Sequence, residues 1–197
     1  MRAVCSILLS LLIFLVTLSG CRKKIGEVTA QAHDSVYVKR GNMIVVATFD
    51  SLRNSLLRAI GTQGFDGAIT FCSENAFVLT NTYADSVSIE RTALRYRNPK
   101  NKPDSLEQVI LENIASELKP GAVPGARIIR DGLNREIHYF KPIMMQSMCL
   151  NCHGKTNDQI NEKTLTRIRQ LYPEDRAVNF KEGDLRGVWH IIFRPRK

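Results

Sequence analysis

The segment MMQSMCLNCHGKT, residues 144–156, contains two cysteines separated by two residues, with a histidine directly after the second. If this segment is helical, Cys149 and Cys152 lie on one side of a turn, because residues three apart are neighbours on a helix. Two thiols and an imidazole in this order can form a disulfide or a redox-active pair, bind zinc, or attach a haem covalently. The rest of the chain helps to choose among these chemistries.

Covalent haem is the interpretation that uses all three side chains. A disulfide or a thiol redox pair leaves His153 without a role, and thioredoxin-like centres accompany a βαβ pattern that we do not find. Structural zinc takes four ligands, usually as two pairs, and the sequence contains no second pair. Cys-x-x-Cys-His is the attachment pattern of c-type haem. We therefore expect one haem c on Cys149 and Cys152, with His153 as the proximal iron ligand; zinc and a thiol pair remain the alternatives.

The N-terminus has the pattern of an export signal. A charged start is followed by an apolar run from Ala3 to Leu18 and by the small residues Ser19 and Gly20. The sequence Leu-Ser-Gly-Cys at 18–21 resembles the lipobox of bacterial lipoproteins, which implies that Cys21 is lipidated. We expect a signal peptide at 1–20, a membrane tether at 21–40 and one domain at 41–197. An uncleaved N-terminal anchor is the alternative, and either places the domain in the cell envelope, facing the periplasm or exterior, with membrane lipid as a partner.

This expected location affects how the net charge and the cysteines are interpreted. The net charge of +9 would suggest nucleic acid, but export to a compartment without nucleic acid excludes that partner. Anionic lipid, an acidic protein or the two haem propionates are the remaining candidates. Of five cysteines, Cys5 is lost with the signal and three are assigned above. Cys72 is the cysteine left without a role.

Hydrophobic periodicity predicts helices first and a sheet afterwards. Strands alternate with inserted helices in the second half, which indicates an α+β domain with an antiparallel sheet. Asp104 and Glu107 have the spacing of a helix N-terminus. The helix at 65–83 has an apolar stripe that includes Cys72, so this side chain should point inward. The expected helices are 44–60, ended by Gly61, then 65–83, 105–119 and 156–172; the expected strands are 86–97, 126–130, 135–145 and 184–194.

The position of the motif separates the chain from common cytochromes. Small electron carriers place the motif early and take a later methionine as ligand, whereas no methionine follows His153 here; helical-bundle cytochromes contain no sheet. Residues 65–193 instead resemble a family of exported single-haem domains with a PAS-like fold. This cyanobacterial-type family, formerly a domain of unknown function, occurs alone or as the input module of bacterial signalling proteins. The resemblance is carried by AITFCSENA (68–76), ERTALRYRNPKNKPD (90–104), HYFKPIMMQSMCLNCHG (138–154) and YPEDRAVNFKEGDLRGVW (172–189).

The resemblance implies that Cys72 is the distal iron ligand, which agrees with its status as the unassigned inward thiol. A buried cysteine without any function is the alternative. Met144 and Met145 are the next candidates for the distal ligand, and an open iron site is a further one. His138 and His190 fall on expected strands, where histidines usually serve as core or surface side chains.

A thiolate ligand lowers the reduction potential of haem and favours the ferric state. We therefore expect a redox or gas sensor that works through a ligand change and signals to a separate redox or signalling protein, because the chain has no transmitter domain. A tethered electron-transfer cytochrome c is the alternative. We do not expect an enzyme, since no convincing distal acid–base pair is present. Four arginines, three on one expected strand face and one further along the chain, are candidates for pairing the propionates: Arg91, Arg95, Arg97 and Arg186. A solvated basic face is the alternative.

Overall fold

The computed structural model describes residues 20–83 and 86–195. It divides into two compact units, residues 1–39 and 40–197, and the fold described below is that of the second. The expected signal peptide lies outside the described residues except for Gly20, as does the side chain of Cys21. Among the described residues, no helix combines the length and the apolar character that a membrane crossing requires.

The described part of the chain forms a five-stranded, fully antiparallel sheet in the order β1-β2-β5-β4-β3. It confirms the expected α+β class, with N-terminal helices before the sheet and further helices inserted between its strands. The long strands β4 and β5 are the centre of the sheet, and each has hydrogen-bonded neighbours on both sides. The strands are β1 (Thr82–Tyr83), β2 (Val87–Thr92), β3 (Arg127–Asp131), β4 (Glu136–Met144) and β5 (Leu185–Phe193).

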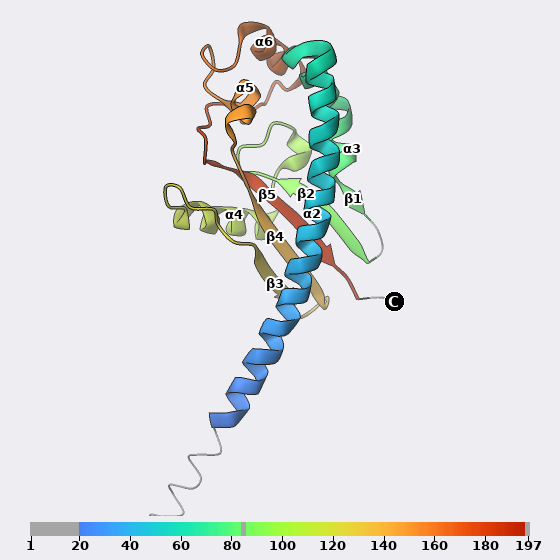
Figure 1. Cartoon of the computed structure of the whole chain (residues 1–197), viewed down its shortest axis with the longest axis vertical. Coiled ribbons are helices and arrows are strands. Elements are labelled where there is room, and N and C mark those ends of the chain that lie inside the picture. Colours follow the sequence, from blue (N-terminus) through green and yellow to red (C-terminus); the bar gives the residue numbers. More distant parts are fainter. Residues whose placement is uncertain (1–19, 84–85, 196–197) are drawn as a thin grey trace, which may run out of the picture. The chain divides into compact units, whose positions relative to one another are not determined.

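Helix α4 (Ser105–Glu117) covers one face of the sheet (Figure 1). Its start is the expected one, because Asp104 Oδ1 accepts from the backbone N–H of Glu107 and the Glu107 carboxylate accepts from the N–H of Asp104. This capping box satisfies two of the donors that a helix N-terminus leaves free. The apolar face of α4 then packs on the sheet through one buried cluster: Ile110, Leu111, Ile114, Phe140 and Val188.

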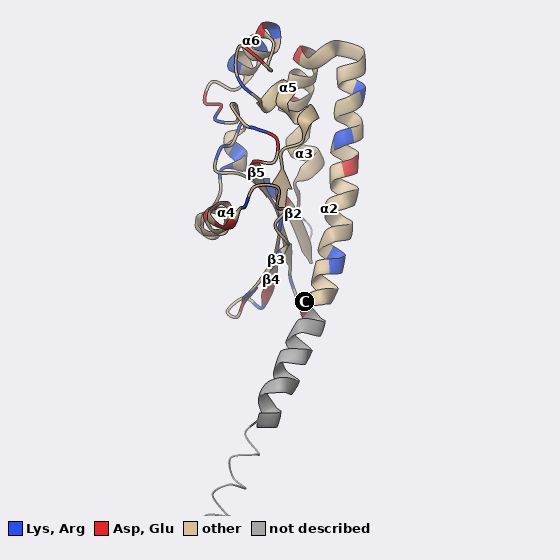
Figure 2. Ribbon diagram, turned by 60° about the vertical axis from the view of Figure 1, so that its left-hand side comes forward, with Lys and Arg blue, Asp and Glu red and all other residues tan. Residues whose placement is uncertain are grey.

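Helix α2 (Gly20–Phe71) lies on the other side of the sheet from Arg40 onward, as both ribbon views show (Figures 1 and 2). Gly41 allows a very close approach, since a Cβ atom at this position would lie 2.7 Å from the ring of Tyr139. The hydroxyl of Tyr139 donates to Asn42 Oδ1 at 2.9 Å. Lysine and arginine positions occur on α2, on α6 and in the loops, so the basic residues are not confined to one element (Figure 2).

Two boundaries in the N-terminal half differ from expectation. The stretch 21–40, expected to be a tether, is helical and continuous with the following helix, and Gly61 does not end that helix. The break falls at Gly64, which adopts φ 71° and ψ −176°. Glycine has no Cβ and tolerates this left-handed φ, whereas Gly61 stays helical. The chain reverses there, which brings the next segment back along α2 (Figure 1).

The segment after Gly64 is helical, as expected, but irregular. Residues 65–71 are α-helical, Cys72–Ala76 form a π-helical turn, and α3 (Phe77–Thr80) ends three residues before the predicted end. π-Helical turns within α-helices are rare and are frequent at functional sites. Here the turn begins at Cys72.

Strand β2 ends at Thr92, so the prediction of a strand through Arg97 is wrong. The alternation continues in the sequence, but the ladder with β5 stops at the pair Thr92–Val188. The chain then turns into the 3-10 turn η2 (Pro99–Asn101). Of the arginines expected on one strand face, only Arg91 is on the strand.

The helix expected at 156–172 is shorter. Helix α6 (Glu162–Leu171) begins after Asn161, whose side-chain oxygen accepts from the N–H of Thr164 at 2.8 Å. Residues 156–160 before it form turns and a bridge between Thr156 and Ile160. The helix packs against the end of α2 in one buried cluster: Ile69, Ile160, Leu165, Ile168 and Tyr172.

Candidate functional site

The Cys-x-x-Cys-His motif folds into two short helical turns after β4. The 3-10 turn η3 (Ser147–Cys149) continues into α5 (Leu150–His153). The turn closes where the N–H of Gly154 donates to Leu150 O at 2.8 Å. Cys149, Cys152 and His153 all line the same pocket. The three-residue spacing therefore places both thiols on the same side of the helical turn, as helical geometry predicts.

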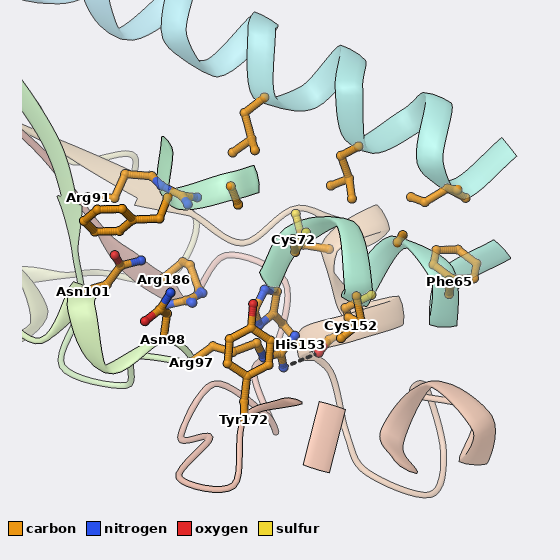
Figure 3. Close-up of a pocket in the computed structure, with 18 of the residues that line it drawn as sticks. Phe65, Cys72, Arg91, Arg97, Asn98, Asn101, Cys152, His153, Tyr172 and Arg186 are labelled. Atoms are coloured by element: carbon orange, nitrogen blue, oxygen red, sulfur yellow. Dashed lines mark hydrogen bonds between the residues drawn. The ribbon is translucent and has the colours of Figure 1, made fainter. Parts of the chain in front are cut away.

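This pocket also contains Cys72, from the π-helical turn (Figure 3). Including the part open to solvent, it encloses about 1010 Å³. The wall from α2 and the segment after it is mostly apolar: Leu52, Leu56, Ile60, Phe65, Ala68 and Ile69. The remaining wall carries the thiols, the imidazole, Met148, Tyr172 and three guanidinium groups. Apolar walls with a few convergent polar groups are typical of cofactor sites.

The imidazole of His153 is fixed in one tautomer. Its Nδ1 lies 2.7 Å from Ala177 O, and a carbonyl oxygen can only accept, so Nδ1 carries the proton and Nε2 has a free lone pair. Burial, together with the positive charges of Arg97 and Arg186, lowers the pKa of His153 well below its ordinary value. A neutral imidazole with one nitrogen free is the form in which histidine binds a metal.

The loop after α6 holds the motif through its backbone. The N–H of Phe180 donates to His153 O at 3.0 Å, and the N–H of Asn179 donates to Gly154 O at 2.7 Å. Asn179 has a positive φ of 60°, which asparagine tolerates better than most residues. No role for these loop residues was predicted from the sequence, although the loop belongs to the stretch 172–189 on which the family resemblance rests.

Burial keeps two of the pocket thiols protonated. It raises the pKa of Cys152 to about 11, and it also raises the pKa of Cys72, against the opposing positive charges of Arg91 and Arg97. Cys72, Cys149 and Cys152 are not in disulfides. Cys72 is thus a neutral thiol next to two cations, which would stabilise its thiolate if a metal removed the proton.

The four candidate arginines have different surroundings. Arg91 and Arg186 line the pocket and have no carboxylate partner among the described residues. Within the described part of the chain, the buried Nε of Arg91 has no hydrogen-bond partner, and burial lowers the pKa of this side chain. Burial and the charges of Arg97 and Arg91 lower the pKa of Arg186 to about 9. The pocket therefore contains two positive charges that the described protein does not neutralise.

Arg97 and Arg95 are bound by other groups of the protein. Arg97 also lines the pocket, but it is 7% exposed and forms a two-point ion pair with Asp175, at 3.2 and 3.1 Å. Arg95 does not line the pocket; its guanidinium stacks on Phe180 with 3.9 Å to the ring centroid and donates to Arg176 O and Val178 O. Both side chains are committed to the protein, and the loss of the strand at Thr92 explains why they diverge from Arg91.

The methionine that lines the pocket is not one of the two expected as alternative iron ligands. Met144 ends β4, and Met145 is buried in a cluster with Ala177 and Phe180. Neither lines the pocket, whereas Met148 does. Cys72 is the candidate distal ligand that the fold brings to the motif.

The two strand histidines lie on the α4 face of the sheet. His190 Nε2 is 3.0 Å from His138 Nδ1, and both rings are buried. Phe140 stacks on His190 with 4.2 Å between ring centroids. Because adjacent strand residues point to opposite faces, this pair is separated from Arg91 and Trp189 by the sheet.

These features define a class of protein: an α+β domain in which two thiols and a neutral imidazole on one helical turn share a pocket with a third thiol. Residues 27–194 match the family model of the Tll0287-like domain, and the chain belongs to the Tll0287-like family. A solved structure described as the cyanobacterial haem protein Tll0287 superposes with a TM-score of 0.53 at 23% identity, covering 80% of this chain and 97% of that one. At this identity the match supports the fold. A search of curated proteins finds no match.

Proposed function

We propose that the chain is a c-type haem protein, with one haem c attached to Cys149 and Cys152. The observation that carries this proposal is the shared pocket: both attachment thiols, the neutral His153 and the separate thiol Cys72 line it. His153 Nε2 would bind the iron on the proximal side and Cys72 on the distal side. The similar protein of known structure is itself described as a haem protein.

The charge of the pocket supports haem as the occupant. A haem presents an apolar macrocycle and two carboxylates. The pocket has apolar walls together with Arg91 and Arg186, which have no carboxylate partner among the described residues. Carboxylate–guanidinium pairs are strong when they are charge-assisted and partly buried. Zinc would use the thiols and the imidazole but would leave both arginines without anions, which is why we favour haem.

We further propose that the protein responds to redox state or to a gaseous ligand. Bound haem supplies reversible one-electron chemistry and an iron site for small ligands. Cys72 would bind as a thiolate in the ferric state, with Arg91 and Arg97 balancing its charge. On reduction, Cys72 would take up a proton and leave the iron, because burial favours the neutral thiol. The π-helical turn would then rearrange.

The same proposal places the chain in the cell envelope, held at the membrane by acylated Cys21 and without catalytic turnover. A signal would pass to a separate redox or signalling protein. A redox titration followed by absorption spectra tests the response, beside Cys72→Ala. Loss of a ligand on reduction in the wild type, absent in the variant, supports sensing. Spectra that show six-coordinate iron in both states support the electron carrier instead.

A further inference from the structure

The proximal side of the pocket contains a buried ion pair that contacts the hydrogen-bond acceptor of His153. Arg97 and Asp175 are each 8% exposed at the side chain. One terminal nitrogen of Arg97 donates to Ala177 O at 3.1 Å, and the same carbonyl lies 2.7 Å from His153 Nδ1. Ala177 O therefore accepts from both the arginine and the imidazole.

The pair is also tied to the motif from two directions. The Arg97 nitrogen that reaches Ala177 O donates to Cys152 O at 2.7 Å. Asp175 Oδ1 accepts from the N–H of Ala177 at 2.8 Å. Arg97 thus bridges the helical turn of the motif and the loop at 175–180, while Asp175 holds both the guanidinium and the loop. Both charged side chains are hydrogen-bonded to the backbone of Ala177. A movement of either side chain would therefore move Ala177 O, which accepts from His153.

Resting on the haem proposed above, we propose that Arg97 and Asp175 are positioning residues that set how strongly His153 donates electrons to the iron. A carbonyl that already accepts from a cation is a weaker acceptor for a second donor. Arg97 therefore weakens the hydrogen bond from His153 Nδ1, which leaves less negative charge on the imidazole and favours the ferrous state. Asp175 opposes this, because its carboxylate offsets the charge of Arg97 and draws the guanidinium toward itself. Hydrogen bonding to the outer nitrogen of a ligating histidine is a recognised way in which proteins tune a metal.

The two members of the pair should shift the potential in opposite directions. Arg97→Gln removes the competing donor and a positive charge, so the haem reduction potential should fall. Asp175→Asn leaves Arg97 charged and free to donate more fully to Ala177 O, so the potential should rise. A purely structural pair would give shifts of the same sign, since either variant would loosen the same loop.

Arg95→Gln is the matched control, because Arg95 donates to the neighbouring carbonyls of Arg176 and Val178 and not to Ala177. This variant removes an equal charge that also binds the loop at 175–180. It should lower the potential less than Arg97→Gln does. If Arg97→Gln fails to fold, Arg97→Lys, which keeps the charge but lacks the planar fork, should lower the potential.

A readout without haem separates this inference from the proposed function. In haem-free protein, NMR of the His153 ring should show a stronger Nδ1–H hydrogen bond in Arg97→Gln and a weaker one in Asp175→Asn. Opposite shifts of the ring resonance support the role of the pair whether or not haem attaches, and opposite shifts in potential support it in the haem-loaded protein. Shifts of the same sign, or an Arg95→Gln effect as large as that of Arg97→Gln, would overturn it.

Discussion

The Nδ1 atom of His190 lies 2.8 Å from Oε1 of Glu107 in the core between the sheet and α4. Both side chains are almost fully buried, at 2% and 4% exposure. Glu107 also belongs to the capping box of α4, so one carboxylate joins the start of a helix to the central strand β5. This contact spans 83 residues and holds α4 on the face of the sheet away from the pocket.

Glu107→Gln should reduce stability by about 2 kcal/mol, because it replaces a buried charge-assisted hydrogen bond with a neutral one, while a glutamine can still complete the capping box. Urea unfolding measures the effect. Gln108→Ala, which removes only an exposed contact with Glu112 on the same helix, is the control and should change stability by less than about 0.5 kcal/mol. A loss of the same size in both variants would show that Glu107 has no special place in the core.

The pH dependence of stability should carry the signature of His190. Burial alone would lower the pKa of His190, but hydrogen bonds to Glu107 and Glu90 raise it above the ordinary value of 6.5. A raised folded-state pKa contributes stability that is complete below the unfolded pKa and is lost as pH rises through the folded pKa. The wild type should therefore lose stability as pH rises above about 6.5.

His138 should act in the opposite sense and at lower pH. Burial and the neighbouring His190 lower its pKa, so stability should fall as the pH drops below 6.5 and the unfolded state takes up a proton first. Urea unfolding at a series of pH values, beside His190→Gln, measures both slopes. If His190→Gln kept the alkaline loss unchanged, the assignment of that loss to His190 would be wrong.

Arg91→Gln combined with Arg186→Gln should stabilise the haem-free protein while weakening its hold on haem. These two cations have no carboxylate partner among the described residues, repel each other and have lost part of their hydration. Their removal should therefore raise stability by about 1 kcal/mol; the gain is small because both side chains are partly exposed. With Cys149→Ser and Cys152→Ser added to prevent covalent attachment, the same change should weaken haem binding about tenfold or more.

Thermal unfolding and a haem titration provide these two measurements. Arg194→Gln is the control, because Arg194 pairs with Glu136 away from the pocket. It should reduce stability slightly and leave haem binding unchanged. Tighter haem binding in the Arg91 and Arg186 variant would contradict the assignment of these cations to the propionates.

Local signals in the sequence predicted most of the elements. The spacing of Asp104 and Glu107 gave the start of α4, and the alternation of β4 and β5 gave the central strands within one residue at each end. Boundaries that depend on long-range pairing were missed. The alternation after Thr92 continues in the sequence, but the strand needs a partner and β5 provides none there. Likewise, the sequence offers two glycines, Gly61 and Gly64, at which the helix could end. The backbone dihedrals show that the break is at Gly64.

The same distinction applies to the site. The haem-attachment motif could be recognised from its residue types and spacing, and Cys72 could be recognised as the cysteine without an assigned role. Asp175 and Ala177 could not, since their roles depend on contacts with Arg97, about 80 residues earlier in the chain. For the same reason the sequence grouped Arg91, Arg95 and Arg97 as one basic face. In the fold, Arg91 and Arg97 both line the pocket, but Arg97 is paired with Asp175, and Arg95 stacks on Phe180 outside the pocket.

Covalent attachment of haem at Cys149 and Cys152 is the central claim, and the mass of the purified protein tests it most directly. The chain should be expressed with c-type maturation machinery and measured after denaturation, with its pyridine haemochrome spectrum recorded in parallel. We predict a mass increased by one haem and a haemochrome typical of two thioether bonds, both abolished in Cys149→Ser combined with Cys152→Ser. A colourless protein with the mass of the polypeptide alone would contradict the account.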